Sequence, residues 1–155
     1  RIPENTYFAV AFGTGMRDTD MVAFFGEGDG TVEDLWSKRI GTPDYDIQND
    51  YTFDVVREGT DYVFTAYRPL QTTDTNGEDY QFTTCESLDM AWVAHTETSE
   101  LKHHDINNIF TLDLPADCFD SVAPEDILYA PGEFDSAKTL ALSAVSSMAL
   151  AYLTM

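Results

Sequence analysis

Short apolar runs separated by turn residues constrain the fold of this chain more than any other feature. The runs are rich in aromatic and β-branched residues, and clusters of Gly, Pro, Asn and Asp lie between them. They span 7–12, 21–25, 31–36, 50–57, 62–68, 80–83, 88–94 and 109–114. No segment from 1 to 114 has a sustained helical period. Strands spaced about ten residues apart predict an all-β protein built as an antiparallel β-sandwich.

Two turns support this prediction. Glu58-Gly59-Thr60-Asp61 separates two alternating segments and gives the clearest hairpin in the sequence. The glycine-rich stretch 26–30 also favours a hairpin turn, because glycine tolerates positive φ. Its Gly-Asp-Gly sequence resembles part of a calcium loop, but the carboxylate spacing and the closing Glu of an EF-hand are missing.

The composition suits one globular domain with a strongly acidic surface. The 155 residues include 28 acidic and 8 basic side chains, for a formal net charge of −20. This charge disfavours nucleic acid and anionic lipid headgroups as direct partners, and a charged partner is expected to be basic. Solubility in a salty or extracellular medium is the alternative reason for this acidity.

Only two cysteines occur, Cys85 and Cys118, and neither has the spacing of a zinc site. One disulfide is expected if the chain is secreted, whereas two buried free thiols are the alternative. The first five residues are polar and lead directly into a strand, which suggests a processed or truncated start.

Few residues mark a catalytic site. The chain has no phosphate-binding Gly-rich loop, no Gly-x-Ser-x-Gly and no His-Glu-x-x-His motif. Its three histidines are His95, His103 and His104. Met16 is unusual because it lies in a polar loop. It either fills a gap under that loop or offers a soft sulfur ligand to a metal.

Five segments in this order resemble the DOMON domain, over about residues 7 to 114. They are Ala11-Phe12-Gly13 followed by Met16 and Asp20-Met21-Val22, then Asp46 to Tyr51, Arg68-Pro69-Leu70, Ala91-Trp92, and His104-Asp105. The resemblance implies an immunoglobulin-like sandwich. In the cytochrome branch of this family, which includes the haem domain of cellobiose dehydrogenase, a b-type haem is bound at one end of the sandwich.

The resemblance implies a haem b site with Met16 and His104 as axial ligands, and with His103 as second choice. Adjacent residues on an extended segment point to opposite faces, so only one of the two histidines is expected to reach the iron. Phe12, Phe24, Phe25 and Trp92 are expected to line an apolar slot. Met/His ligation fills both axial positions and suits an extracytoplasmic electron-transfer domain rather than a self-contained catalyst.

Two features of the family leave an alternative open. Family members have one or two further strands before the position of Tyr7, and here only six residues precede it. In addition, some DOMON domains bind no haem. The alternative function is a haem-free module at the cell surface that binds a carbohydrate or a protein.

The C-terminal part differs in composition from the sandwich, which is expected over 1–118. Residues 119–138 form a polar linker, and residues 139–155 are uncharged throughout. Seventeen such residues are near the lower limit of a membrane span, which needs about 20. We expect a hydrophobic helix that anchors the chain at the extracellular face of a membrane, or a GPI signal. A helix packed on the sandwich is the alternative.

Overall fold

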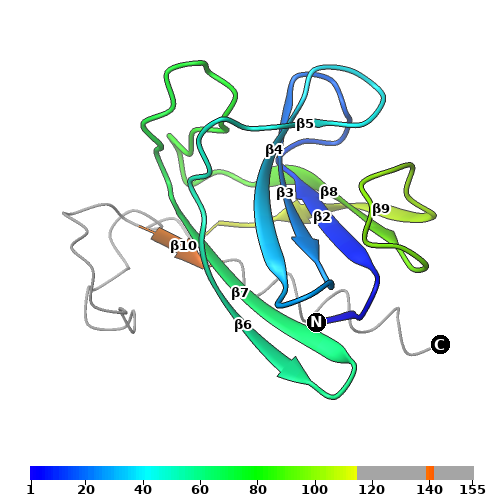
Figure 1. Cartoon of the computed structure of the whole chain (residues 1–155). Coiled ribbons are helices and arrows are strands. Elements are labelled where there is room, and N and C mark those ends of the chain that lie inside the picture. The colour runs from blue at the N-terminus through cyan, green and yellow to red at the C-terminus, as the bar shows by residue number, and fades with distance from the viewer. Residues whose placement is uncertain (115–138, 142–155) are drawn as a thin grey trace.

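The computed structural model describes residues 1–114 and 139–141, which form two antiparallel sheets (Figure 1). The strands are β1 (Ile2–Pro3), β2 (Tyr7–Ala11), β3 (Thr19–Phe25), β4 (Thr31–Ser37), β5 (Asp44–Tyr45), β6 (Thr52–Glu58), β7 (Asp61–Pro69), β8 (Leu88–His95), β9 (Ile106–Leu112) and β10 (Thr139–Ala141). The larger sheet has the order β5-β4-β3-β2-β8-β9, and β1, β6, β7 and β10 make the smaller one. The expected all-β sandwich is confirmed.

Strands β2 and β3 lie at the centre of the larger sheet and bury both of their faces. Their register pairs Tyr7 with Phe25 and Ala11 with Met21. The turn between β3 and β4 is the expected hairpin turn, in which Gly30 N–H donates to the Glu27 carbonyl over 2.8 Å. Gly28 and Gly30 have φ angles of 58° and 81°, so this turn uses the freedom of glycine.

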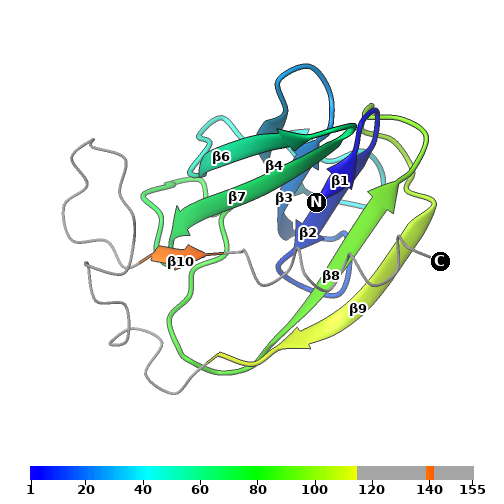
Figure 2. The same cartoon turned by 90° about the horizontal axis from the view of Figure 1, so that it is seen from below.

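Strand β7 organises the smaller sheet. It pairs with β6 in the expected hairpin, whose turn contains Gly59 at a φ of 68°. On its other edge β1 pairs near one end, at Tyr62, and β10 pairs near the other end, at Tyr67 to Pro69. Figure 2 shows β10 beside β7, although the two strands are far apart in the sequence.

The C-terminal tail begins differently from the expectation. Residues 139–141 were expected to start a helix, but they form strand β10, because their backbone pairs with β7. The linker 119–138 and the rest of the hydrophobic tail, 142–155, lie outside the described residues. Within the ranges that the structure describes, no helix has the length and hydropathy needed to cross a bilayer.

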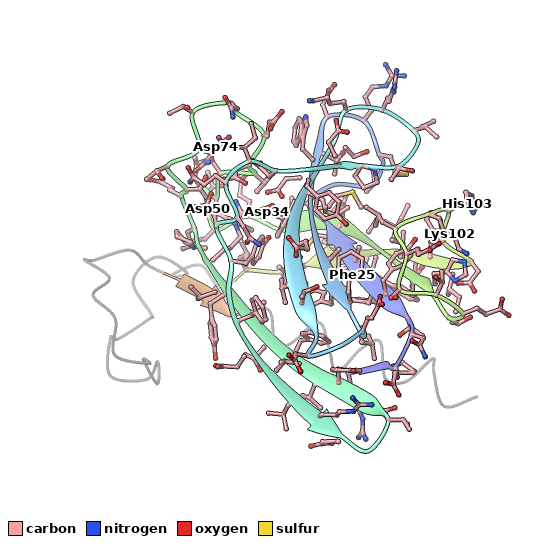
Figure 3. The ribbon with its side chains drawn as sticks, viewed as in Figure 1. Phe25, Asp34, Asp50, Asp74, Lys102 and His103 are labelled. Carbon is pink, nitrogen blue, oxygen red and sulfur yellow. The ribbon has the colours of Figure 1, made fainter. Side chains whose placement is uncertain are left out.

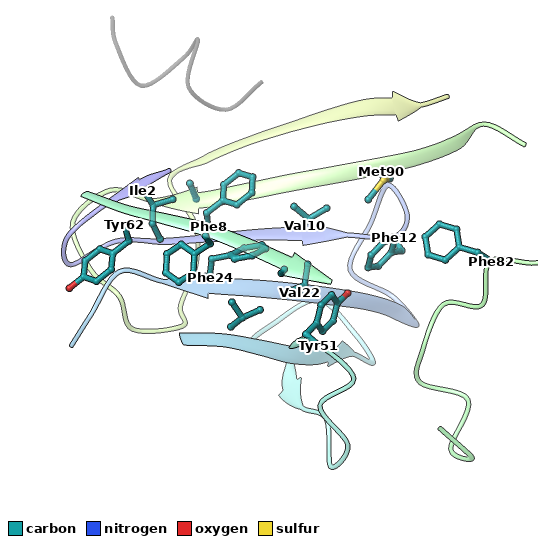
Figure 4. Close-up of a cluster of buried hydrophobic side chains, with 14 of the residues drawn as sticks. Ile2, Phe8, Val10, Phe12, Val22, Phe24, Tyr51, Tyr62, Phe82 and Met90 are labelled. Carbon is teal, nitrogen blue, oxygen red and sulfur yellow. The ribbon is translucent and has the colours of Figure 1, made fainter. Parts of the chain in front are cut away.

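The main core lies between the two sheets. Side chains at alternate positions of the central strands point to it and meet side chains of β7 (Figure 4). The buried members are Ile2, Phe8, Val10, Phe12, Val22, Phe24, Val32, Tyr51, Tyr62, Phe64, Ala66, Leu70, Phe82, Met90 and Ala94. Phe24 and Phe64, from different sheets, meet edge to face with 5.7 Å between ring centroids.

The segment 80–83 was expected to be a strand, and this prediction is wrong. None of these four residues is part of a strand. Phe82 N–H donates to the Leu70 carbonyl over 2.9 Å, and its ring packs edge to face on Phe12 at 5.6 Å. Burial of one aromatic ring, rather than sheet pairing, holds this segment on the core.

Just beyond this segment Cys85 is disulfide-bonded, and Cys118 lies outside the described residues.

Candidate functional site

The larger sheet buries apolar side chains on its outer face as well, on the side away from the smaller sheet. Side chains alternate along a strand, so the neighbours of the core residues point outward. Buried there are Tyr7, Ala9, Ala11, Met21, Ala23, Phe25 and Leu35, and Ala91, Val93 and Leu101 pack against them. We call this set the outer cluster.

Small side chains occupy the middle of the outer cluster. Ala9 is paired with Ala23 across the β2–β3 ladder, and Ala11 is paired with Ala91 across the β2–β8 ladder. Methyl groups rise less from a sheet than the aromatic ring of Phe25 beside them. A planar apolar group placed here would come close to the backbone of the sheet.

Two loops meet the outer cluster from opposite ends of β2. The β2–β3 loop, 12–18, lies at the Ala11 end, where the Met16 carbonyl accepts a hydrogen bond from Ser37 Oγ over 2.6 Å. The β8–β9 loop, 96–105, lies at the Tyr7 end, where the Tyr7 hydroxyl donates to the Lys102 carbonyl. A strand of five residues, roughly 13 Å between its end Cα atoms, separates the two loops.

His104 has the properties of a ligand without a partner. It is half-buried, and its Nδ1 atom is buried without a hydrogen-bond partner. Burial lowers the pKa of this imidazole, and the neighbouring His103 lowers it further. The ring is therefore held in its neutral form, which is the form that binds metals.

His103 lies beside His104 rather than on the opposite face. The two rings are stacked, with 5.0 Å between their centroids and 18° between their planes. The expectation that they point to opposite faces is wrong, because this loop is not an extended strand. His103 is exposed, as Figure 3 shows at the rim of the loop, whereas His104 is half-buried.

The four aromatic residues expected around a haem fall on different faces of the sheet. Phe25 belongs to the outer cluster. Phe12, Phe24 and Trp92 instead belong to the core between the sheets, because their alternate positions on the strands point inward. Only Phe25 therefore shares a face with the loops of Met16 and His104.

A second group of polar side chains is buried at the other side of the larger sheet. Arg68 from β7 is fully buried, and its Nη1 donates to Asp20 Oδ2 on β3 over 2.5 Å. The guanidinium also lies 5.2 Å from the Phe12 ring centroid and 5.4 Å from that of Tyr51. This ion pair joins the two sheets through the core.

Two more carboxylates adjoin this ion pair. Asp34 from β4 and Asp79 from the loop after β7 are both buried, and Arg68 Nη2 lies 3.7 Å from Asp79 Oδ1. Burial, together with the negative charges of Asp20 and Asp79, raises the pKa of Asp34 to about 8. Burial likewise raises the pKa of Asp79 to about 7. We call Asp20, Asp34 and Asp79 the carboxylate cluster.

The family model of the DOMON domain matches residues 1–95 of this chain. The chain belongs to the DOMON family. No curated protein matches it. Among solved structures, it is similar to the cytochrome domain of cellobiose dehydrogenase from Myriococcum thermophilum, with a TM-score of 0.57 and 17% sequence identity. The match covers 76% of this chain and 64% of that one, and at this identity it shows a shared fold.

Within this DOMON domain the match to the family model ends at His95, so the β8–β9 loop and β9 lie beyond it. Met16 is inside the match, and His104 is outside it. The carboxylate cluster was missed at the level of sequence. Its signal was present, however: Asp20, Asp34 and Arg68 sit in strands at positions whose side chains point into the core.

Proposed function

We propose that this DOMON domain binds a b-type haem on its outer cluster and transfers electrons, with Met16 and His104 as the axial ligands. One observation carries the proposal: the loops of Met16 and His104 approach one buried apolar face from opposite ends. Met16 and His104 would hold the group from these two loops, and the apolar face would exclude water from it. The similarity to a cytochrome domain supports it.

The donor set fits this group. A thioether and a neutral imidazole form an axial ligand pair that electron-transfer haems use, and haem would supply a one-electron redox couple when bound. His104 offers a buried imidazole nitrogen that has no protein partner. Ala9, Ala23 and Phe25 would provide apolar contact and exclude water.

The loops must separate to admit the group. Leu101 packs against the outer cluster, and the alanines beneath it are buried. Tyr7 ties the β8–β9 loop to the sheet through its hydrogen bond to Lys102. We expect this loop to open for haem entry and to close with His104 over the face.

We further propose that the domain works outside the cytoplasm with a basic redox partner, and that its tail associates with a membrane. The net charge of −20 favours a cationic partner and disfavours nucleic acid. The disulfide at Cys85 is typical of an oxidising compartment. The uncharged run 139–155 supports the membrane association.

A haem-free binding module is the second candidate. Ile40, Tyr45 and Ile47 have 83%, 59% and 91% of their surface exposed, in and beside the loop that contains β5. Exposed apolar side chains grouped along one loop are typical of a surface that contacts another protein. A chain that takes up no haem would favour this second function.

Absorption spectra of the purified full chain, reconstituted with haem, test the proposal. We expect a sharp split band on reduction and no binding of carbon monoxide, because both axial positions are filled. Met16→Ala should retain haem but bind carbon monoxide, and His104→Ala should weaken haem retention.

Two matched variants serve as controls. Met21→Leu removes the thioether that lies within the outer cluster, and His103→Ala removes the imidazole stacked on His104. Both variants should leave the reduced spectrum unchanged. A chain that gives no specific haem spectrum would refute the electron-transfer function. Loss of the spectrum in His103→Ala alone would move the ligand to that residue.

A further inference from the structure

The carboxylate cluster is short of positive charge. Asp20, Asp34 and Asp79 bring three carboxylates into the core, and one buried guanidinium, that of Arg68, lies beside them. If all three carboxylates are ionised, two negative charges remain without a counterion. Buried carboxylates are stable only when they are paired, bound to a metal or protonated.

The geometry of the cluster gathers oxygen atoms around one point. One carboxylate oxygen from each of the three residues lies within 4.8 Å of the others. Oxygens no farther apart than this can all contact one ion that lies about 2.4 Å from each of them, which is a calcium–oxygen distance. Figure 3 shows Asp34 near Asp50, where the loop before β6 covers this end of the sandwich.

Four of the oxygens accept no hydrogen bond, although Asp79 Oδ1 also lies 3.7 Å from Arg68 Nη2. Asp20 Oδ1, Asp34 Oδ1 and both Oδ atoms of Asp79 are buried and accept no hydrogen bond. The side chains of Asp20 and Asp79 are only 2% and 1% exposed. A buried acceptor without a hydrogen-bond donor is unfavourable, so four of them in one place require an explanation.

The remaining oxygens hold the carboxylates in place. Asp34 Oδ2 accepts from Asp50 N–H over 3.2 Å, and Asp20 Oδ2 accepts from Tyr80 N–H over 2.6 Å. The loops before β6 and after β7 therefore fix the orientation of both side chains. The other oxygen of each carboxylate, Oδ1, stays without a hydrogen-bond donor.

We propose that Asp20, Asp34 and Asp79 bind a divalent cation, Ca²⁺, that ties β3, β4 and the loop after β7 together. A charge of +2 balances the cluster once Arg68 is counted. All the offered ligands are oxygens, which suit Ca²⁺ rather than zinc or copper. Ca²⁺ takes six to eight ligands, so water or backbone carbonyls complete its shell.

Calorimetric titration of the chelator-treated full chain with CaCl₂ tests the site. We expect one Ca²⁺ per chain and a higher melting temperature in CaCl₂ than in chelator. Asp34→Asn should lower the affinity at least tenfold. Asp79→Asn, which changes a loop rather than a strand, should do the same if the strand variant does not fold.

The matched control is Asp54→Asn, which removes one carboxylate from the exposed face of β6. It should bind Ca²⁺ as the parent chain does. A parent chain with no binding heat and no change in melting temperature would overturn the proposal. Parental affinity in both Asp34→Asn and Asp79→Asn would also overturn it, because Ca²⁺ would then bind elsewhere.

Discussion

The inner and outer faces of the central strands use different side chains, although both are buried. Along β2 the inner face carries Phe8 and Val10, with Phe12 directly after the strand, whereas the outer face carries Tyr7, Ala9 and Ala11. Another sheet covers the inner face, and two loops reach over the outer one.

The difference shows what each face contributes. Large interlocking side chains on the inner face supply the apolar burial that stabilises the domain. The outer face buries alanines, which contribute less apolar area but leave the sheet accessible to a flat ligand once the loops open. Stability and haem binding should therefore respond to different substitutions.

The largest effect is expected on the inner face. Phe8→Ala removes a ring that packs against Phe24 and Trp92, with 6.1 Å and 5.9 Å between the ring centroids. It should lower the free energy of unfolding by about 3–5 kcal/mol, as measured by urea denaturation, because a cavity remains. The folded fraction of this variant should still bind haem with the stoichiometry of the parent chain. Loss of haem without loss of stability would mean that the faces are not independent.

An intermediate effect is expected on the outer face. Ala23→Phe places a ring where only a methyl group fits, and overpacking costs about 1–3 kcal/mol. The variant should fold but fail to take up haem, which reduced-minus-oxidised spectra would show. Thr31→Phe, an exposed change on β4, is the control and should bind haem normally. Normal uptake by Ala23→Phe would place the haem elsewhere.

A third effect concerns the polar end of the inner face and depends on pH. The pKa of Asp34 is raised from 3.8 to about 8, so between these values the folded state holds a proton that the unfolded state has released. In chelator, the free energy of unfolding should therefore fall as pH rises from 4 to 8.

Urea denaturation midpoints at several pH values would measure this slope. Asp34→Asn should flatten it, because the asparagine side chain does not titrate. Saturating Ca²⁺ should oppose the loss at pH 8, since the ion replaces the proton. A slope that is identical in the parent and in Asp34→Asn would assign the pH dependence to other groups.

The fold was largely predictable because strands and turns leave local signals. Alternating residues and the glycines of the turns indicated most of the strands of 1–114. Segment 80–83 was mistaken for a strand because an aromatic anchor such as Phe82 has the same local pattern as a buried strand. Strand β10 could not be foreseen, since its pairing with β7 depends on contacts that are distant in sequence.

The candidate site was only partly predictable. The family resemblance pointed to Met16 and His104, but it does not state which face each aromatic residue occupies. The alternation of β3 separates Phe24 from Phe25, and that distinction needs the register of the sheet. The carboxylate cluster can be recognised only in the three-dimensional structure, because Asp79 comes from a loop whose position follows no periodic pattern.

The position of β10 has a consequence for the order in which the chain folds. Strand β7 is complete at Pro69, but its partner β10 begins about 70 residues later, at Thr139. During synthesis, the edge of β7 that β10 occupies stays open until that distant segment has left the ribosome. Sheet pairing over such a separation is slow and exposes an edge to other chains. We expect a chaperone to bind the nascent chain at this edge.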